Sequence, residues 1–394
     1  MATSIAIIIL LAIASNFILE KIKLPGLLGM LILGITIGPY GFNLIHGDLL
    51  NISPDLRKIA LIVILLRAGL GIKTSDLKKI GKPAIKMSCI PGILEGFAIA
   101  FIATKLLGFT FIQGGILGFI IAAVSPAIVV PQMINLIDNK IGTNKSIPTL
   151  ILAGASIDDA FAITILTSCL ALYAGKSVNL ASQLLQIPIS IILGIGLGLI
   201  LGFIIIYLFK KFNINVVKKI LIVLAFSILL TTLETIFKDK VLIASLLGVM
   251  TIGFILTEKL PKVAAPLSQG LNQLWVFAEI LLFVLVGAQV NISVAFTSGP
   301  IGIVIIFIGL ICRSIGVIIS LIGTNLNVKE KIFCVISYIP KATVQAAMGA
   351  LPLSLGVASG DLILAISVLS ILITAPLGAI GINVSSKSLL QVQN

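Results

Sequence analysis

Two adjacent carboxylates, Asp158 and Asp159, lie in the middle of an apolar segment long enough to cross a lipid bilayer. A carboxylate at the centre of a membrane helix costs roughly 3 kcal/mol on insertion scales, so the pair predicts a functional site. Two carboxylates this close cannot both ionise cheaply in a low dielectric, and the pair can therefore hold a proton or a small cation. A polar pair that only fixes helix packing is the alternative, but Ser or Gly would do this at lower cost.

The composition excludes an ordinary soluble domain. Hydrophobic residues make up 59% of the 394 residues, charged residues make up 10%, and the mean hydropathy is +1.24. Soluble proteins carry about 25% charged residues. The net charge of +13 arises from basic residues in short loops, where they set topology, so we predict no nucleic-acid partner.

Apolar runs separated by Pro, Gly, Lys or Asn predict an all-α polytopic membrane protein that contacts membrane lipid. The thirteen expected spans are 4–19, 24–40, 57–72, 84–107, 111–137, 147–173, 185–209, 217–234, 241–257, 271–289, 299–323, 331–357 and 361–381. Eighteen Lys and Arg residues fall in loops on the side of the C-terminus and six on the other side. This bias predicts a cytoplasmic C-terminus and an external N-terminus.

The two halves of the chain resemble each other. Residues 158–166 match 361–369, and residues 27–30 match 246–249. We therefore expect two inverted six-helix repeats, about 1–175 and about 217–381, joined by a linker helix at about 185–209. Inverted repeats with a binding site at their interface are typical of transporters.

Two spans at equivalent positions of these repeats contain a proline in mid-span, Pro126 and Pro340. Proline removes a backbone donor and disrupts the preceding turn, so we predict two crossed, broken helices within core helices at about 111–173 and 331–381. Irregular backbone is tolerated at membrane depth where it lines a cavity. A kinked but continuous helix is the alternative for each span.

Basic residues inside apolar spans need partners. Lys341 follows the second break, and we expect it to pair with Asp158 as charge compensation. Glu95 and Arg313 lie in repeat-equivalent spans and predict a structural ion pair, which is costly to break from one side.

Arg67 is harder to place, because several polar residues of one span could serve it. Either Gln289 or Glu279 is a candidate partner. A structural role is favoured over a role in transport.

No enzyme or cofactor motif appears in the sequence. It contains no Walker A loop, Rossmann fingerprint, His/Cys cluster or nucleophile–base constellation. An intramembrane aspartyl protease would place its aspartates on separate helices, whereas these are adjacent. We therefore predict neither an enzyme nor a cofactor.

Three motifs, at residues 124–131, 156–159 and 339–347, resemble the monovalent cation/proton antiporter superfamily. The resemblance is strongest to its sodium/proton antiporter branch, which includes the mitochondrial-type sodium/hydrogen exchangers of animals. It implies a homodimer with a dimerisation domain and a core domain. It also implies that Asp159 binds the cation and that Asp158 pairs with Lys341, with Glu95 and Arg313 as the membrane bridge. Ser125, in the first motif, is a further candidate ligand for the cation or proton.

The chain departs from that family at Gln289, where relatives carry Glu. The sequence as a whole predicts a secondary antiporter of a prokaryotic plasma membrane, with a role in pH homeostasis, that exchanges cytoplasmic Na⁺ or Li⁺ for external protons. The cation and the proton would compete for Asp158 and Asp159 as the core exposes the site alternately to each side. A K⁺/H⁺ antiporter and a gated cation channel are the alternatives.

Overall fold

The protein is all-helical. A computed structural model describes residues 2–21, 26–72, 74–175, 180–237, 243–293 and 299–392, and within them the only β-structure is an isolated bridge between Ile141 and Val392. The all-α class predicted from the sequence is confirmed. Nine helical segments of this described part are long and apolar enough to cross a membrane, whereas the count of thirteen crossings stays a prediction.

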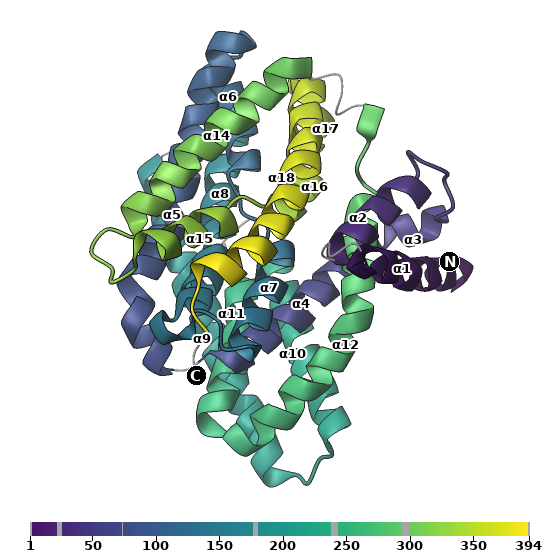
Figure 1. Cartoon of the computed structure of the whole chain (residues 1–394), viewed down its shortest axis with the longest axis vertical. Coiled ribbons are helices and arrows are strands. Elements are labelled where there is room, and N and C mark those ends of the chain that lie inside the picture. The colour runs from purple at the N-terminus through teal and green to yellow at the C-terminus, as the bar shows by residue number, and fades with distance from the viewer. Residues whose placement is uncertain are drawn as a thin grey trace.

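The helices follow one another as Figure 1 shows. Their bounds are α1 (Ala2–Lys21), α2 (Gly26–Ile37), α3 (Gly47–Asn51), α4 (Ser53–Gly71), α5 (Thr74–Leu106), α6 (Phe111–Ile121), α7 (Pro126–Asp138), η1 (Thr143–Lys145), α8 (Ile147–Tyr173), α9 (Leu180–Lys211), α10 (Val216–Phe237), α11 (Ser245–Lys259), α12 (Pro261–Gly287), α14 (Gly299–Ser320), α15 (Val328–Ser337), α16 (Thr343–Met348), α17 (Leu351–Ser354) and α18 (Gly360–Leu389). Some lysines used to predict orientation lie outside the described residues, namely Lys23, Lys73, Lys176, Lys238 and Lys240.

Two membrane segments are interrupted in the middle. The first is α6 followed by α7, with non-helical residues 122–125 between them, and the second is α15 followed by α16, with non-helical residues 338–342. Pro126 is the first residue of α7, where its missing N–H costs nothing, and Ser125 before it is extended, with φ −85° and ψ 107°. The second interruption contains Pro340, which cannot donate a helical hydrogen bond.

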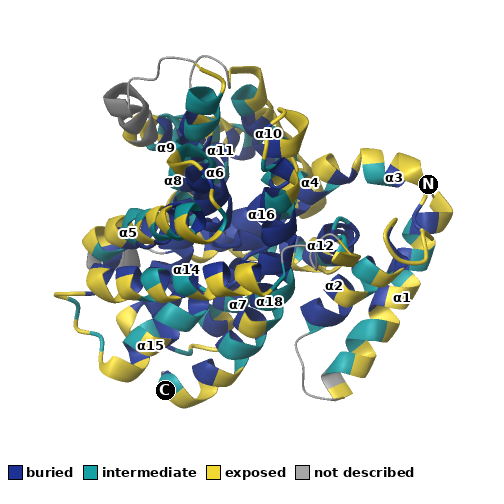
Figure 2. Cartoon of the chain, turned by 90° about the horizontal axis from the view of Figure 1, so that it is seen from above, coloured by how far each residue is buried: buried dark blue, intermediate teal, exposed yellow. Residues whose placement is uncertain are grey.

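The helices that carry charged residues pack around these interruptions. Helix α5 packs against α6, α8 and α14, and α18 packs against α6, α7, α14, α15 and α16. A Cβ at Gly118 would lie 2.2 Å from the carbonyl oxygen of Gly96, so α5 and α6 touch through their backbones, as small residues permit in membranes. Buried residues gather around α16, whereas outward faces of α1, α5 and α10 are exposed (Figure 2). The interruptions therefore lie in the most enclosed part of the protein.

Candidate functional site

The two broken helices meet where their backbones leave the helical path. The Ser125 amide donates a hydrogen bond of 2.8 Å to the Pro340 carbonyl. The last carbonyls of a helix have no partner within it. The side chain of Gln345, in α16, donates hydrogen bonds to carbonyls at the end of α6. Its Nε2 lies 2.9 Å from the Ile120 oxygen and 3.0 Å from the Ala123 oxygen. Each broken helix therefore completes the hydrogen bonding of the other.

Arg313, from α14, binds the ends of both broken helices. Its Nε donates to the Tyr338 carbonyl at 2.6 Å, and its Nη1 donates to the Ala122 carbonyl. Tyr338 and Ala122 are the capping residues at the C-terminal ends of α15 and α6, where the helix dipole concentrates negative charge. A guanidinium is a planar fork with several donors, so one side chain can hold both ends.

Four charged side chains form a buried quartet around this guanidinium: Glu95, Asp158, Arg313 and Lys341. Arg313 Nη1 lies 2.7 Å from Glu95 Oε2, and Nη2 lies 3.1 Å from Asp158 Oδ2. Lys341 Nζ lies 2.7 Å from the same Glu95 oxygen. All four side chains are at most 2% exposed. Two carboxylates and two cations give the quartet no net charge.

The partner of Lys341 differs from the one expected from the sequence. Lys341 contacts Glu95 and not Asp158, whose Oδ2 accepts hydrogen bonds from Arg313 and, at 2.8 Å, from the Val124 amide. The reason is that the Arg313 fork, fixed by the two helix ends, reaches both carboxylates at once. The pairing of Asp158 with Lys341 is corrected accordingly, while Glu95 and Arg313 are in contact.

Asp159 is the carboxylate that the quartet leaves uncompensated. No Lys, Arg or His of the described residues lies within ion-pair distance of it. Its Oδ1 is buried without a hydrogen-bond partner in this part of the chain, as are Asp158 Oδ1 and Ser125 Oγ. Oxygen atoms are the ligands that hard cations prefer. These three residues therefore offer oxygens that could hold a proton or a small cation.

Asp159 also lines a cavity of about 110 Å³, together with Ser156 and Thr164 of the same helix, Glu234 of α10 and Ser245 near the start of α11. Water occupies about 30 Å³ per molecule in the liquid, so the cavity has room for a partly hydrated ion. Ser245 Oγ donates a hydrogen bond to Glu234. Sequence reasoning missed Glu234, although a carboxylate at the end of an apolar run was a usable signal.

Arg67 has a partner that the sequence did not indicate. Its Nη2 lies 2.6 Å from Asp138 Oδ2, at the end of α7. Gln289 instead accepts a hydrogen bond of 2.9 Å from Arg57 Nη1, and the structure shows no ion pair between Arg67 and Glu279. Ten residues of helix separate the two arginines by about 15 Å, so only Arg57 reaches the residues after α12. Gln289 was the wrong partner for Arg67, whereas Glu279 lies near enough to Arg67 to interact with its charge without forming a direct ion pair.

Comparison with known proteins identifies the family of this chain. A family profile described as "Sodium/hydrogen exchanger, transmembrane" matches residues 5–384. Human sodium/hydrogen exchanger 9B2 is 33% identical over 385 residues, covering 93% of this chain and 70% of the human protein. Sodium/hydrogen exchanger 9B1 of Macaca fascicularis is 33% identical over 402 residues, covering 96% of this chain and 77% of its own length.

A solved structure, that of the sodium proton antiporter MjNhaP1 from Methanocaldococcus jannaschii at pH 8, has the same fold. Its TM-score is 0.77 at 20% sequence identity, covering 98% of this chain and 97% of MjNhaP1. The family profile spans nearly all of the sequence, and the resemblance seen in the three motifs is confirmed. This chain is a multi-pass membrane protein that belongs to the sodium/hydrogen exchanger family.

Proposed function

We propose that this protein exchanges Na⁺ or Li⁺ for protons by alternating access, and that the two ions compete for Asp159. The observation that carries the proposal is the distribution of charge at the crossing. The buried quartet is neutral as a whole, whereas Asp159 has no cationic partner in the described structure and faces a cavity. A bound proton or monovalent cation would neutralise it.

Neutralisation gives a physical reason for obligatory exchange. An empty, ionised Asp159 is costly to move through a low-dielectric barrier, because burying an uncompensated charge is unfavourable. The same residue loaded with a proton or with Na⁺ carries no net charge. The free-energy barrier to movement of the core is therefore low only when Asp159 holds a proton or a cation. One ion must then be exchanged for the other.

The neighbouring residues take supporting roles in this proposal. Asp158 and Ser125 offer further oxygens to the cation, and Lys341 compensates charge through Glu95. The breaks at Pro126 and Pro340 hold the site open at membrane depth. The core helices at about 111–173 and 331–381 would move against the rest of a homodimer in a prokaryotic plasma membrane, with the C-terminus in the cytoplasm.

The relatives support the choice of ions. Those matched by sequence are named sodium/hydrogen exchangers, and MjNhaP1 is a sodium proton antiporter. K⁺/H⁺ exchange is the alternative, because carboxylate and hydroxyl oxygens bind either ion.

The test is exchange by the purified protein in proteoliposomes, with Na⁺, Li⁺ and K⁺ compared side by side. D159N should abolish cation-dependent proton movement and leave the protein folded. D55N, which changes an exposed aspartate of α4, is the matched control and should exchange normally. Retained Na⁺-dependent proton flux in D159N would refute the assignment. Current that is linear in voltage, without proton coupling, would indicate a channel.

Competition has its own signature in pH. If one proton displaces one cation, the half-saturating Na⁺ concentration should rise by up to about tenfold for each unit that the pH falls. Saturating Na⁺ should restore the maximal rate at acid pH. A separate pH-sensing gate would instead lower the maximal rate at unchanged affinity. Initial rates from pH 6 to 9 distinguish the two, and a pH-independent affinity rules out a shared site.

A further inference from the structure

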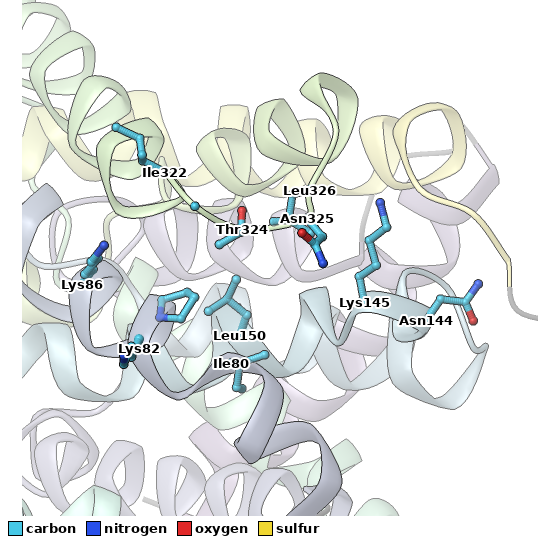
Figure 3. A pocket seen from close by; sticks show the side chains of 12 residues that line it. Ile80, Lys82, Lys86, Asn144, Lys145, Leu150, Ile322, Thr324, Asn325 and Leu326 are labelled. Atoms are coloured by element: carbon cyan, nitrogen blue, oxygen red, sulfur yellow. The ribbon is translucent and has the colours of Figure 1, made fainter.

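A second and larger cavity, of about 700 Å³, lies near the N-terminal end of α8 (Figure 3). It shares no lining residue with the cavity of Asp159. Its lining comes from the first turns of α5, from η1, from α8 and from the loop between α14 and α15. The C-terminus lies on the same side, because the Gly142 amide, just before η1, donates a hydrogen bond of 2.8 Å to the Gln391 carbonyl. The cavity therefore lies on the side of the C-terminus, for which the sequence predicts most of the basic loop residues.

The polar part of this cavity is basic. Lys82, Lys86 and Lys145 line it, and no carboxylate is among its described lining residues. Lys145 is already paired, with its Nζ 2.8 Å from Glu330 Oε2. Lys82 and Lys86 are exposed and have no ion-pair partner in the described structure. Like charges four residues apart on a helix repel each other, so a bound anion would relieve this pair.

The rest of the lining suits an amphiphile. In Figure 3, Thr324 and Asn325, which add hydrogen-bonding groups, lie across the cavity from Leu150 and Ile80. Ile80 is also the residue at which the membrane-spanning part of α5 begins, so this cavity lies at the edge of the membrane-spanning region. Leu150 and Ile80 are themselves buried, but Ile322, which also lines the cavity, is 64% exposed. A free anion would leave Ile322 in contact with water, whereas an acyl chain would cover it.

We propose that this cavity binds the phosphate group of an anionic glycerophospholipid, with Lys82 and Lys86 on the phosphate and the acyl chains over the exposed Ile322. Basic pockets between membrane helices on one side of a bilayer are suited to acidic headgroups. The bound lipid would bridge α5, which carries Glu95, and the loop that follows α14, the helix that carries Arg313. Lipid binding should therefore stabilise the packing of the buried quartet.

The test is lipid binding by the detergent-purified full chain, measured by native mass spectrometry and by protection against heating. Phosphatidylglycerol is compared with phosphatidylcholine of the same acyl chains and with inorganic phosphate. The variants are K82Q/K86Q, the charge-preserving K82R/K86R, and K210Q/K218Q, which removes two exposed lysines of the same side elsewhere.

Each lysine near an anionic lipid contributes about fivefold to affinity, so K82Q/K86Q should bind phosphatidylglycerol about 30-fold more weakly. K82R/K86R and K210Q/K218Q should bind it as the wild type does, and phosphatidylcholine should bind weakly throughout. Equal affinity of K82Q/K86Q and wild type would overturn the site. Equal protection by inorganic phosphate alone would overturn the lipid as ligand. Ion exchange does not enter the measurement, so either failure is distinct from a failure of the proposed antiport.

Discussion

The ion pairs of Glu95 in the buried quartet predict how much stability the protein loses when this carboxylate is neutralised. In the structure, Glu95 Oε2 accepts from both Arg313 and Lys341 at 2.7 Å, and these side chains are at most 2% exposed. E95Q would leave two buried cations with one anion, Asp158, which forms an ion pair with Arg313 but not with Lys341. Breaking a buried ion pair from one side costs about 3–5 kcal/mol. At roughly 2 °C per kcal/mol for a large domain, the melting temperature should fall by about 6–10 °C.

A second substitution should reverse part of this loss. E95Q/K341M removes one anion and one cation, so the remaining Arg313–Asp158 pair is again neutral. The coupling between residues in contact is typically about 0.5–3 kcal/mol, and we expect a value near the top of that range. E95Q/K341M should therefore melt several degrees above the additive expectation.

The matched cycle is D158N/K341M, which tests the pairing expected from the sequence. Asp158 contacts Arg313 and the Val124 amide, so its coupling to Lys341 should be smaller than that of Glu95. The assay is the fraction of folded protein that remains after heating in detergent, separated by size exclusion. Stronger coupling in the D158N/K341M cycle than in the E95Q/K341M cycle would refute the arrangement described here.

Three further predictions concern single residues. E234Q should raise the half-saturating cation concentration with little change in maximal rate, because the carboxylate lines the cavity of Asp159; an unchanged affinity in proteoliposomes would exclude this role. Q289E should raise the melting temperature, because it replaces a neutral partner of the buried Arg57 by a charged one, a gain of about 1 kcal/mol, and a drop would show that desolvation dominates. D159N should melt at or above the wild-type temperature, because it removes a buried carboxylate that has no cationic partner in the described structure; a loss comparable to that of E95Q would reveal an unseen partner.

Local sequence was enough to predict the helical class, and it singled out the carboxylates that we propose as the ion site. Long apolar runs specify membrane helices because backbone groups must be satisfied within each segment. Carboxylates inside such runs are costly enough to be a functional-site hypothesis without any structure. The non-helical residues 122–125 and 338–342 lie at the two prolines singled out from the sequence.

Partners across helices could not be predicted in the same way. The quartet draws one residue each from α5, α8, α14 and the second interruption, and sequence spacing fixes only the directions of side chains within one helix. Arg313 was expected to serve one carboxylate, but its fork also binds two helix ends and thereby reaches Asp158. The partner of Arg67 could not be predicted from the sequence for the same reason. Asp138 becomes its neighbour only through the packing of α4 against α7.

The charges around Asp158 and Asp159 differ, and this difference gives a reason for having two adjacent aspartates. Consecutive residues on a helix point about 100° apart, so Asp158 can face the crossing while Asp159 faces the cavity. The first is held by Arg313 and the Val124 amide, and the second has no cationic partner among the described residues. A single carboxylate could not both pair with Arg313 and bind the transported ion. It would bind the ion only by breaking the ion pair, at a cost of several kcal/mol. In the proposed exchange, two neighbouring residues would let the crossing stay neutral while Asp159 gains and loses its ion.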